Sequence, residues 1–138
     1  MTLRVAPNLM MDGNAKEAIQ FYKDILDAEV LSITTYADIA EFPGMSFSEK
    51  ILDRIAYATL KIGHTELKIY DSPGFSRQIG NQVAIHLTAT DPVKTKQIFE
   101  AFQEEGKVIG PLEKTSFTSA QGMVMDKFGV TFTIVTDN

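Results

Sequence analysis

The stretch that decides the fold spans residues 14–26 and reads NAKEAIQFYKDIL. Its apolar side chains, from Ala15 to Leu26, recur with the 3.6-residue period of an amphipathic helix. Asn14 is a preferred N-cap residue because its side-chain oxygen can accept a hydrogen bond from a free backbone amide, and Glu17 completes the spacing of a capping box. The stretch therefore predicts a helix that starts at Asn14 and packs one face against a core.

A second stretch with the same organisation begins 77 residues later, where residues 91–103 read DPVKTKQIFEAFQ. Asp91 suits the N-cap, and Pro92 suits the first helical position, where no backbone donor is lost. We expect Gly106 to end this helix, as glycine commonly does just beyond a helix C-terminus. The chain therefore contains an internal repeat built around two helices.

Most of the remaining chain has the composition of β-strands, with β-branched and aromatic residues between turn signals. The predicted strands are residues 3–11, 29–36, 54–62, 65–71, 82–90, 107–117, 122–126 and 129–136. Residues 37–52, which include Pro43 and Gly44, predict a long loop. Residues 72–81, which include Pro73, predict a linker in the middle of the chain.

The linker separates two similar halves, each with the order βαβββ. The first half is residues 1–71 and the second is residues 82–138, within a single domain of residues 1–138. Neither half can close its own sheet, so the two halves must pair. We therefore predict an α+β fold in which two βαβββ modules form a cup-shaped mixed sheet, with the helices on its convex side.

Composition excludes several classes of function. The chain of 138 residues carries 13 basic and 18 acidic side chains, a net charge of −5, and no cysteine. It therefore has no thiolate metal site and no cysteine nucleophile, and it lacks the basic stripe that a nucleic-acid partner would need. No apolar run approaches the ~18 residues that would cross a membrane, and no signal peptide is predicted. We expect a cytoplasmic protein.

One strand carries the best polar candidate for a site. In residues 83–89 the odd positions, from Val83 to Ala89, are apolar and predict the face that packs on a helix. His86 then lies on the other face, toward the concave side of the cup. It is either a core histidine bound to one neighbour or a residue that contacts a ligand. The repeat places Asn8, 78 residues earlier, at the matching position, with Met10 beside it.

The orientation of the strand at residues 65–71 is open. Its even positions, from Glu66 to Tyr70, are typical of a solvated face with cross-strand pairs. The alternative comes from aligning the turn at Gly63, before this strand, with the turn at Gly129 in the second half. This alignment places Leu67 inside the cup. We adopt the second alternative for the candidate site.

Four stretches carry a resemblance to a known family, namely residues 11–26, 67–72, 106–113 and 122–132. They resemble the PhnB-like branch of the vicinal oxygen chelate superfamily, which includes glyoxalase I, bleomycin-resistance proteins and extradiol dioxygenases. The resemblance implies the cup-shaped fold and a homodimer, with or without exchanged elements, which the linker would permit. Some members are labelled 3-demethylubiquinone-9 3-methyltransferase, but this sequence has no strand–glycine–helix unit of the kind that approaches an adenosyl cofactor.

Metal enzymes of this superfamily hold a divalent ion with His or Glu side chains on four strands inside the cup. The matching positions of this sequence are Ala6 or Pro7, Leu67, Ala84 and Thr133. None of these side chains supplies a carboxylate or imidazole ligand, and His86 alone is fewer than the three protein ligands usual for a catalytic metal. The resemblance therefore predicts no metal site of the family type and no other cofactor.

Three functions remain open. The first is a binding protein that holds a small, partly apolar molecule in the cup without chemistry. The second is an enzyme that acts on a carbonyl-containing small molecule, with a recruited divalent ion or with His86 as general acid–base. The third is a structural role in which side chains fill the cup. We favour the first, with candidate ligand-binding residues Asn8, Met10, Leu67, His86, Phe117 and Met123.

Overall fold

The computed structural model describes residues 2–74 and 76–136, which form two compact units: the first ends at Arg77 and the second begins at Gln78. The elements of the first unit are β1 (Asn8–Met11), α1 (Ala15–Leu26), β2 (Glu29–Thr35), α2 (Tyr36–Ile39), a 3₁₀ turn (Glu49–Ile51), β3 (Ile55–Ile62) and β4 (Thr65–Asp71). The elements of the second unit are β5 (Ile85–Ala89), α3 (Pro92–Gln103), β6 (Lys107–Glu113), β7 (Ala120–Met125) and β8 (Thr131–Thr136).

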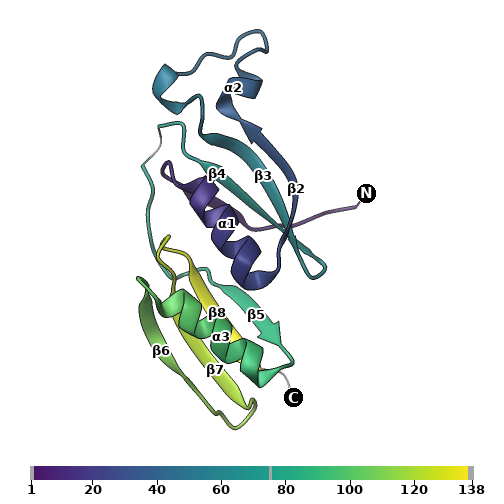
Figure 1. Ribbon diagram of the computed structural model, residues 1–138, viewed down its shortest axis with the longest axis vertical. Helices are drawn as coiled ribbons and strands as arrows, with labels where there is room; N and C mark the ends of the chain where they lie inside the picture. The colour runs from purple at the N-terminus through teal and green to yellow at the C-terminus, as the bar shows by residue number, and fades with distance from the viewer. Residues whose placement is uncertain (1, 75, 137–138) are drawn as a thin grey trace. The chain divides into compact units, whose positions relative to one another are not determined.

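Both units have the same topology, which Figure 1 shows for each of them. The strand order is β1-β4-β3-β2 in the first unit and β5-β8-β7-β6 in the second. In each unit the first and last strands pair in parallel, and the remaining pairs are antiparallel. The predicted α+β class and the βαβββ order are therefore confirmed, with one mixed sheet in each unit.

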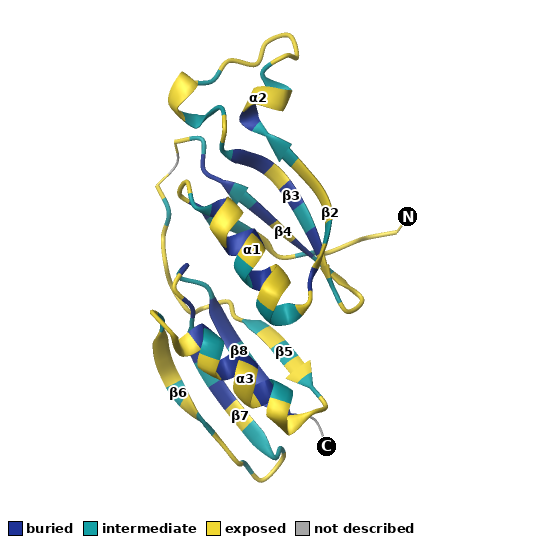
Figure 2. Cartoon of the chain, viewed as in Figure 1, coloured by how far each residue is buried: buried dark blue, intermediate teal, exposed yellow. Residues whose placement is uncertain are grey.

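One face of each sheet is covered by the long helix of its own unit (Figures 1 and 2). In the second unit, the ring of Phe102 on α3 lies 4.5 Å from the ring of Phe132 on β8, measured between centroids. Phe132 pairs with Ile85 on β5, and side chains of paired residues point to the same face. The apolar positions of β5 therefore face α3, as the alternation in the sequence predicts. Val83 is an exception, because it precedes β5 and is exposed.

The two long helices start in different ways, and one of them corrects a prediction. The Asp91 carboxylate accepts a hydrogen bond of 2.9 Å from the Val93 amide, as expected of an N-cap. Asn14 makes no side-chain cap, so the predicted capping role is wrong. The Asp71 carboxylate, at the end of β4, accepts the Ala15 amide at 3.0 Å instead. A charged acceptor is a stronger partner for this amide than the neutral Asn14 side chain.

The end of α3 also differs from the prediction. The residue with left-handed backbone is Glu105, with φ of 58°, and not Gly106. Gly106 is required for space, because a Cβ there would overlap the carbonyl oxygens of Phe102 and Met125. The glycine therefore lets the chain pass close to β7 after the helix, which the spacing of the sequence alone does not reveal.

Several predicted segments have different bounds in the structure. The first predicted strand, residues 3–11, is a strand only over Asn8–Met11. The long loop after β2 contains the short helix α2, which a capping box at Thr35 and Asp38 begins. The predicted strand at residues 107–117 ends at Glu113. Beyond it, the Thr115 hydroxyl accepts the backbone amides of Phe117 and Thr118, and this local turn replaces the strand ladder.

In the described part of the chain, every helix is too short or too polar to span a membrane.

Candidate functional site

The candidate site is a cavity of about 420 Å³ on the open face of the first unit, defined here as the sheet face opposite α1. Tyr57 of β3 and Tyr70 of β4 form part of its wall. The connector between β2 and β3 supplies Tyr36 and Phe47. The lining is thus mainly apolar, with four aromatic rings and a few polar groups. Cavities of this composition are typical of small-molecule sites.

A row of three polar residues crosses this open face at neighbouring positions. Asn8 of β1 pairs with Lys68 of β4, and Lys68 pairs with Thr59 of β3. The Lys68 ammonium donates a hydrogen bond of 3.0 Å to the Thr59 hydroxyl. All three residues line the cavity, and we call them the polar row of the first unit.

A second cavity, of about 750 Å³, adjoins the first, since Asn8 and Lys68 line both. Its charged residues are Arg4, Glu66 and Lys68. The Arg4 guanidinium lies 2.9 Å from one Glu66 carboxylate oxygen, and the Lys68 ammonium lies 3.6 Å from the other. Two cations thus share one carboxylate, so these three groups together carry a net positive charge.

Tyr36 is fixed at the side of the cavity by two contacts. Its hydroxyl donates a hydrogen bond of 2.6 Å to the backbone carbonyl of Asp71. Its ring packs on Phe47 with centroids 4.9 Å apart. Burial raises the pKa of the Tyr36 hydroxyl above its ordinary value, and the nearby negative charge of Asp71 adds to the increase. Tyr36 is therefore a neutral hydrogen-bond donor over a wide pH range.

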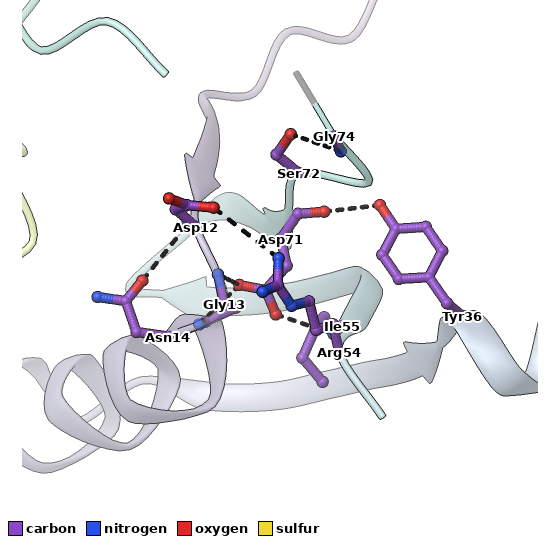
Figure 3. A network of polar contacts seen from close by, with 10 residues as sticks. Asp12, Gly13, Asn14, Tyr36, Arg54, Ile55, Asp71, Ser72 and Gly74 are labelled. Carbon is purple, nitrogen blue, oxygen red and sulfur yellow. Dashed lines mark hydrogen bonds and ion pairs between the residues drawn. The ribbon is translucent and has the colours of Figure 1, made fainter. Parts of the chain in front are cut away.

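The Asp71 carboxylate holds this end of the sheet together, as Figure 3 shows. One oxygen accepts the amides of Gly13 at 2.8 Å and Ala15 at 3.0 Å, and the other accepts the amide of Ile55 at 3.0 Å. Asp71 is almost fully buried, so these bonds replace the water it would otherwise bind. One side chain thereby joins the start of α1, the start of β3 and the end of β4.

The second unit has an equivalent row on its own open face, opposite α3. His86 of β5 pairs with Thr133 of β8, and Thr133 pairs with Met123 of β7. Their strand neighbours on the other face include Phe132, which contacts α3. His86 is exposed and is not packed under the helix. We call these three residues the equivalent row of the second unit.

Of the six predicted ligand-binding residues, some lie in the first unit and the others in the second. Asn8 and Met10 lie on the open face of the first unit, and His86 and Met123 lie together on that of the second. Phe117 lies in the loop between β6 and β7 with an exposed fraction of 92%.

Leu67 corrects the prediction for β4. It is 3% exposed and pairs with the fully buried Leu60, on the face toward α1. The face that was expected to be outside, with Lys68 and Tyr70, is the one that lines the cavity. Because side chains alternate along a strand, an alignment error of one residue is enough to exchange the two faces.

Most residues of the cavity were missed by reasoning from the sequence, among them Tyr36, Tyr57, Lys68 and Tyr70. A signal for two of them existed. The alternation of Glu66, Lys68 and Tyr70 indicated a polar face, and this face was assigned to solvent. Tyr36 and Tyr57 gave no such signal, because the connector that holds Tyr36 has no periodic pattern.

The residues of the two rows do not fit a metal ion. On the open faces, the rows contain an amide, an ammonium, hydroxyls, a thioether and one imidazole. Among residues 2–74 and 76–136, no three His, Asp or Glu side chains converge as a metal site would require. We derive no chemical step through a metal.

A family model described as 3-demethylubiquinone-9 3-methyltransferase matches residues 3–135 of the chain. A crystal structure of protein PA1353 from Pseudomonas aeruginosa is similar with a TM-score of 0.85 and 25% identity, over 99% of this chain and 98% of that one. A PhnB protein from Bacillus cereus has a TM-score of 0.81 and 23% identity, over 97% of this chain and 99% of that one.

The fold extends to more distant proteins. The fosfomycin resistance protein FosX from Mesorhizobium loti has a TM-score of 0.63 and 10% identity, over 100% of this chain and 94% of that one. At this identity the likeness concerns the fold alone. Together with the PhnB protein, it shows the fold that the resemblance implies.

Proposed function

Because the chain belongs to the 3-demethylubiquinone-9 3-methyltransferase family, in its PhnB-like form, we propose that it binds a small, partly apolar molecule on the open faces of its sheets. The observation that carries this proposal is the aromatic cavity of about 420 Å³ beside the polar row. A cavity with a mainly apolar wall and a few polar groups can hold and orient such a molecule.

The methyl transfer in the family's description receives no support from the first βα turn. A turn that approaches an adenosyl cofactor needs several glycines, so that the backbone can come close to the ligand. The turn between β1 and α1 contains Gly13 only, and a Cβ there would lie 3.2 Å from the Arg54 guanidinium. The space beside this turn is therefore taken by a side chain, and binding is the function we propose.

The experiment that tests the proposal is native mass spectrometry of the protein purified under gentle conditions. A small molecule retained in stoichiometric amount, and released on unfolding, is the expected result. Binding of no small molecule, either on purification or from a library of partly apolar compounds, would contradict the proposal. Tyr57→Ala is the variant to compare, since Tyr57 lines the cavity and its exposed fraction of 66% makes the change tolerable for folding.

The proposed binding does not use a metal of the family type. This part of the proposal is supported by the donor set of the two rows, which offers one imidazole and no carboxylate. Elemental analysis of protein purified without chelator tests it. Zinc, nickel, manganese or iron at near one equivalent per chain would contradict it.

We further propose that two chains pair as a homodimer. Each sheet has open edge strands, and several large apolar side chains are exposed, among them Val5, Val83 and Phe117. Pairing of chains would cover such groups. Light scattering coupled to gel filtration should give about twice the chain mass of 15.3 kDa. A monomer at micromolar concentration would contradict this proposal.

A further inference from the structure

We propose that the ligand of the first unit is an organic acid, with a ring-containing apolar body and one anionic group that Lys68 binds. This inference rests on the proposed binding function and names the class of molecule. It concerns the cavity beside the polar row, whose wall combines three tyrosines with a single charged residue, Lys68.

The charge on this face has the sign that an acid needs. Lys68 is the charged residue among those that line the aromatic cavity. Its neighbour Glu66 lies on the adjoining cavity and is already engaged by Arg4 at 2.9 Å and Lys68 at 3.6 Å. The net charge of these three groups is positive, whereas the whole chain carries −5. A local positive excess in an acidic protein would attract an anion and repel a cation.

The ammonium of Lys68 is available for a further partner. Its side chain is 46% exposed. An ammonium has three donors, and the hydrogen bond to the Thr59 hydroxyl at 3.0 Å uses one of them while fixing the direction of the group. Asn8 lies beside Lys68 in the register, and its amide can donate to the same anionic group. The polar row therefore presents donors from two neighbouring strands.

The rings supply the other half of the site. Tyr57 is 66% exposed, which is unusual for so large an aromatic side chain on a strand and typical of a binding surface. Tyr36 and Phe47 add a second aromatic wall that the hydrogen bond to Asp71 holds in place. A flat apolar body would pack against these rings while its acid group reaches Lys68.

Two fluorescent probes of almost the same shape distinguish the contribution of a ligand's anionic group to binding from that of its apolar body. They are 1-anilinonaphthalene-8-sulfonate, which carries an anionic group, and N-phenyl-1-naphthylamine, which is neutral. We expect the protein to bind both, and the sulfonate more tightly. Lys68→Met, which keeps the length of the side chain, should weaken binding of the sulfonate about tenfold or more and change that of the neutral probe less than twofold.

Two variants control for other causes. Lys23→Met removes the same charge from α1, on the opposite face of the sheet, and should leave the binding of both probes unchanged. Tyr57→Ala should weaken both probes together, which would place them in the cavity. Circular dichroism confirms that each variant is folded. If Lys68→Met does not fold, the unmodified protein still decides: added salt should weaken the sulfonate and leave the neutral probe unaffected.

The outcomes separate the inference from the proposed function. If both probes bind with equal affinity, and neither Lys68→Met nor salt distinguishes them, the preference for an acid is wrong while the binding function stands. If Lys68→Met and Lys23→Met weaken the sulfonate equally, the effect is one of net charge, and the role of Lys68 is wrong. If neither probe binds to the unmodified protein, the inference is wrong, and the proposed function is decided by the native mass spectrometry and the compound library described above.

Discussion

The two rows on the open faces occupy equivalent places in the repeat and differ in chemistry. Asn8, Lys68 and Thr59 cross the first sheet, and His86, Thr133 and Met123 cross the second in the same strand order. The first row contains an amide, an ammonium and a hydroxyl, whereas the second contains an imidazole, a hydroxyl and a thioether.

This difference shows what the fold fixes and what it leaves free. The faces toward α1 and α3 are similar in both units, because each must fill the space under a helix with apolar side chains. The open faces have no such constraint, so their residues diverge. In a repeated fold, the positions where the two copies differ most in chemistry are therefore candidates for function.

The largest expected effect concerns the ends of the last strands, Asp71 in β4 and Thr136 in β8. Asp71 accepts three backbone amides, whereas the buried Thr136 hydroxyl has no partner among residues 2–74 and 76–136. Asp71→Ala should lower the free energy of unfolding by about 3 kcal/mol, because two buried amides and one part-buried amide lose a charged acceptor. Urea unfolding followed by circular dichroism measures the change.

Thr136→Val is the matched control for this prediction. It removes an unsatisfied hydroxyl at constant shape and should be neutral or stabilising by up to about 1 kcal/mol. A large loss of stability in Thr136→Val, or a small one in Asp71→Ala, would show that the two strand ends are more alike than their contacts indicate.

The next effect concerns a helix-facing position that is equivalent in the two units. Ala58, which pairs with Ile69, occupies it in the first unit. Gly122, which pairs with Ile134, occupies it in the second. A Cβ at Gly122 would lie 2.6 Å from the ring of Phe99, so the second unit cannot accept the alanine that the first unit has there. Gly122→Ala should destabilise the protein by about 1–3 kcal/mol. Thermal unfolding measures it.

Gly110→Ala, on the neighbouring strand, is the matched control. The closest atom to a Cβ there is the Met123 amide nitrogen at 4.0 Å, which is ordinary contact. This variant should be neutral or stabilising by up to about 1 kcal/mol, since it restricts the unfolded chain. Equal losses in both glycine variants would mean that backbone conformation, and not the Phe99 ring, requires Gly122.

A smaller effect tests each row by itself. Asn8→Ala should weaken binding of the molecule that co-purifies five- to tenfold, since a lost hydrogen bond to a polar group costs ~1 kcal/mol, and His86→Ala tests the row of the second unit in the same way. Isothermal titration calorimetry measures the affinity, and thermal unfolding shows that stability is unchanged. Unchanged affinity in His86→Ala, with the expected loss in Asn8→Ala, would restrict the site to the first unit.

The smallest effect concerns the connector residue Tyr36. Its pKa is raised above the ordinary value of about 10, so folding favours the protonated hydroxyl. The stability from this group is fully present below pH ~10 and is lost as the pH rises through the folded-state pKa. Tyr36→Phe should remove part of the alkaline loss of stability, whereas Tyr57→Phe, at an exposed position, should not. Urea midpoints between neutral and alkaline pH measure the difference.

Periodicity in the sequence was sufficient to predict the helices and strands and their order along the chain. The stripes from Ala15 to Leu26 and around Phe99 and Phe102 predict both long helices, because a helix must bury one apolar face. The cap at Asp91 was predictable because its partner, Val93, is two residues away. The cap of α1 was not, since its acceptor is Asp71, 56 residues from Ala15 in sequence.

The site was only partly predictable, and the reason is the register of β4. Helix-facing residues of the two last strands, Ile69 and Ile134, are 65 residues apart, but the glycine turns at Gly63 and Gly129 are 66 apart. The turn between β7 and β8 is longer than that between β3 and β4, so alignment through the glycines shifts the strands by one residue. That shift placed Leu67 in the site and excluded Lys68.

The position of Asp71 also has a consequence for the order of folding. Its amide partners at Gly13 and Ala15 lie 58 and 56 residues away, and β1 pairs with β4 over a similar separation. Contacts between residues so far apart in the sequence require closure of a long loop, whereas the hairpin of β3 and β4 joins neighbouring segments and can form early. We expect the amino-terminal segment to dock after the folding barrier is crossed, so that loss of the Asp71 contacts to Gly13 and Ala15 accelerates unfolding and has little effect on the refolding rate in stopped-flow measurements.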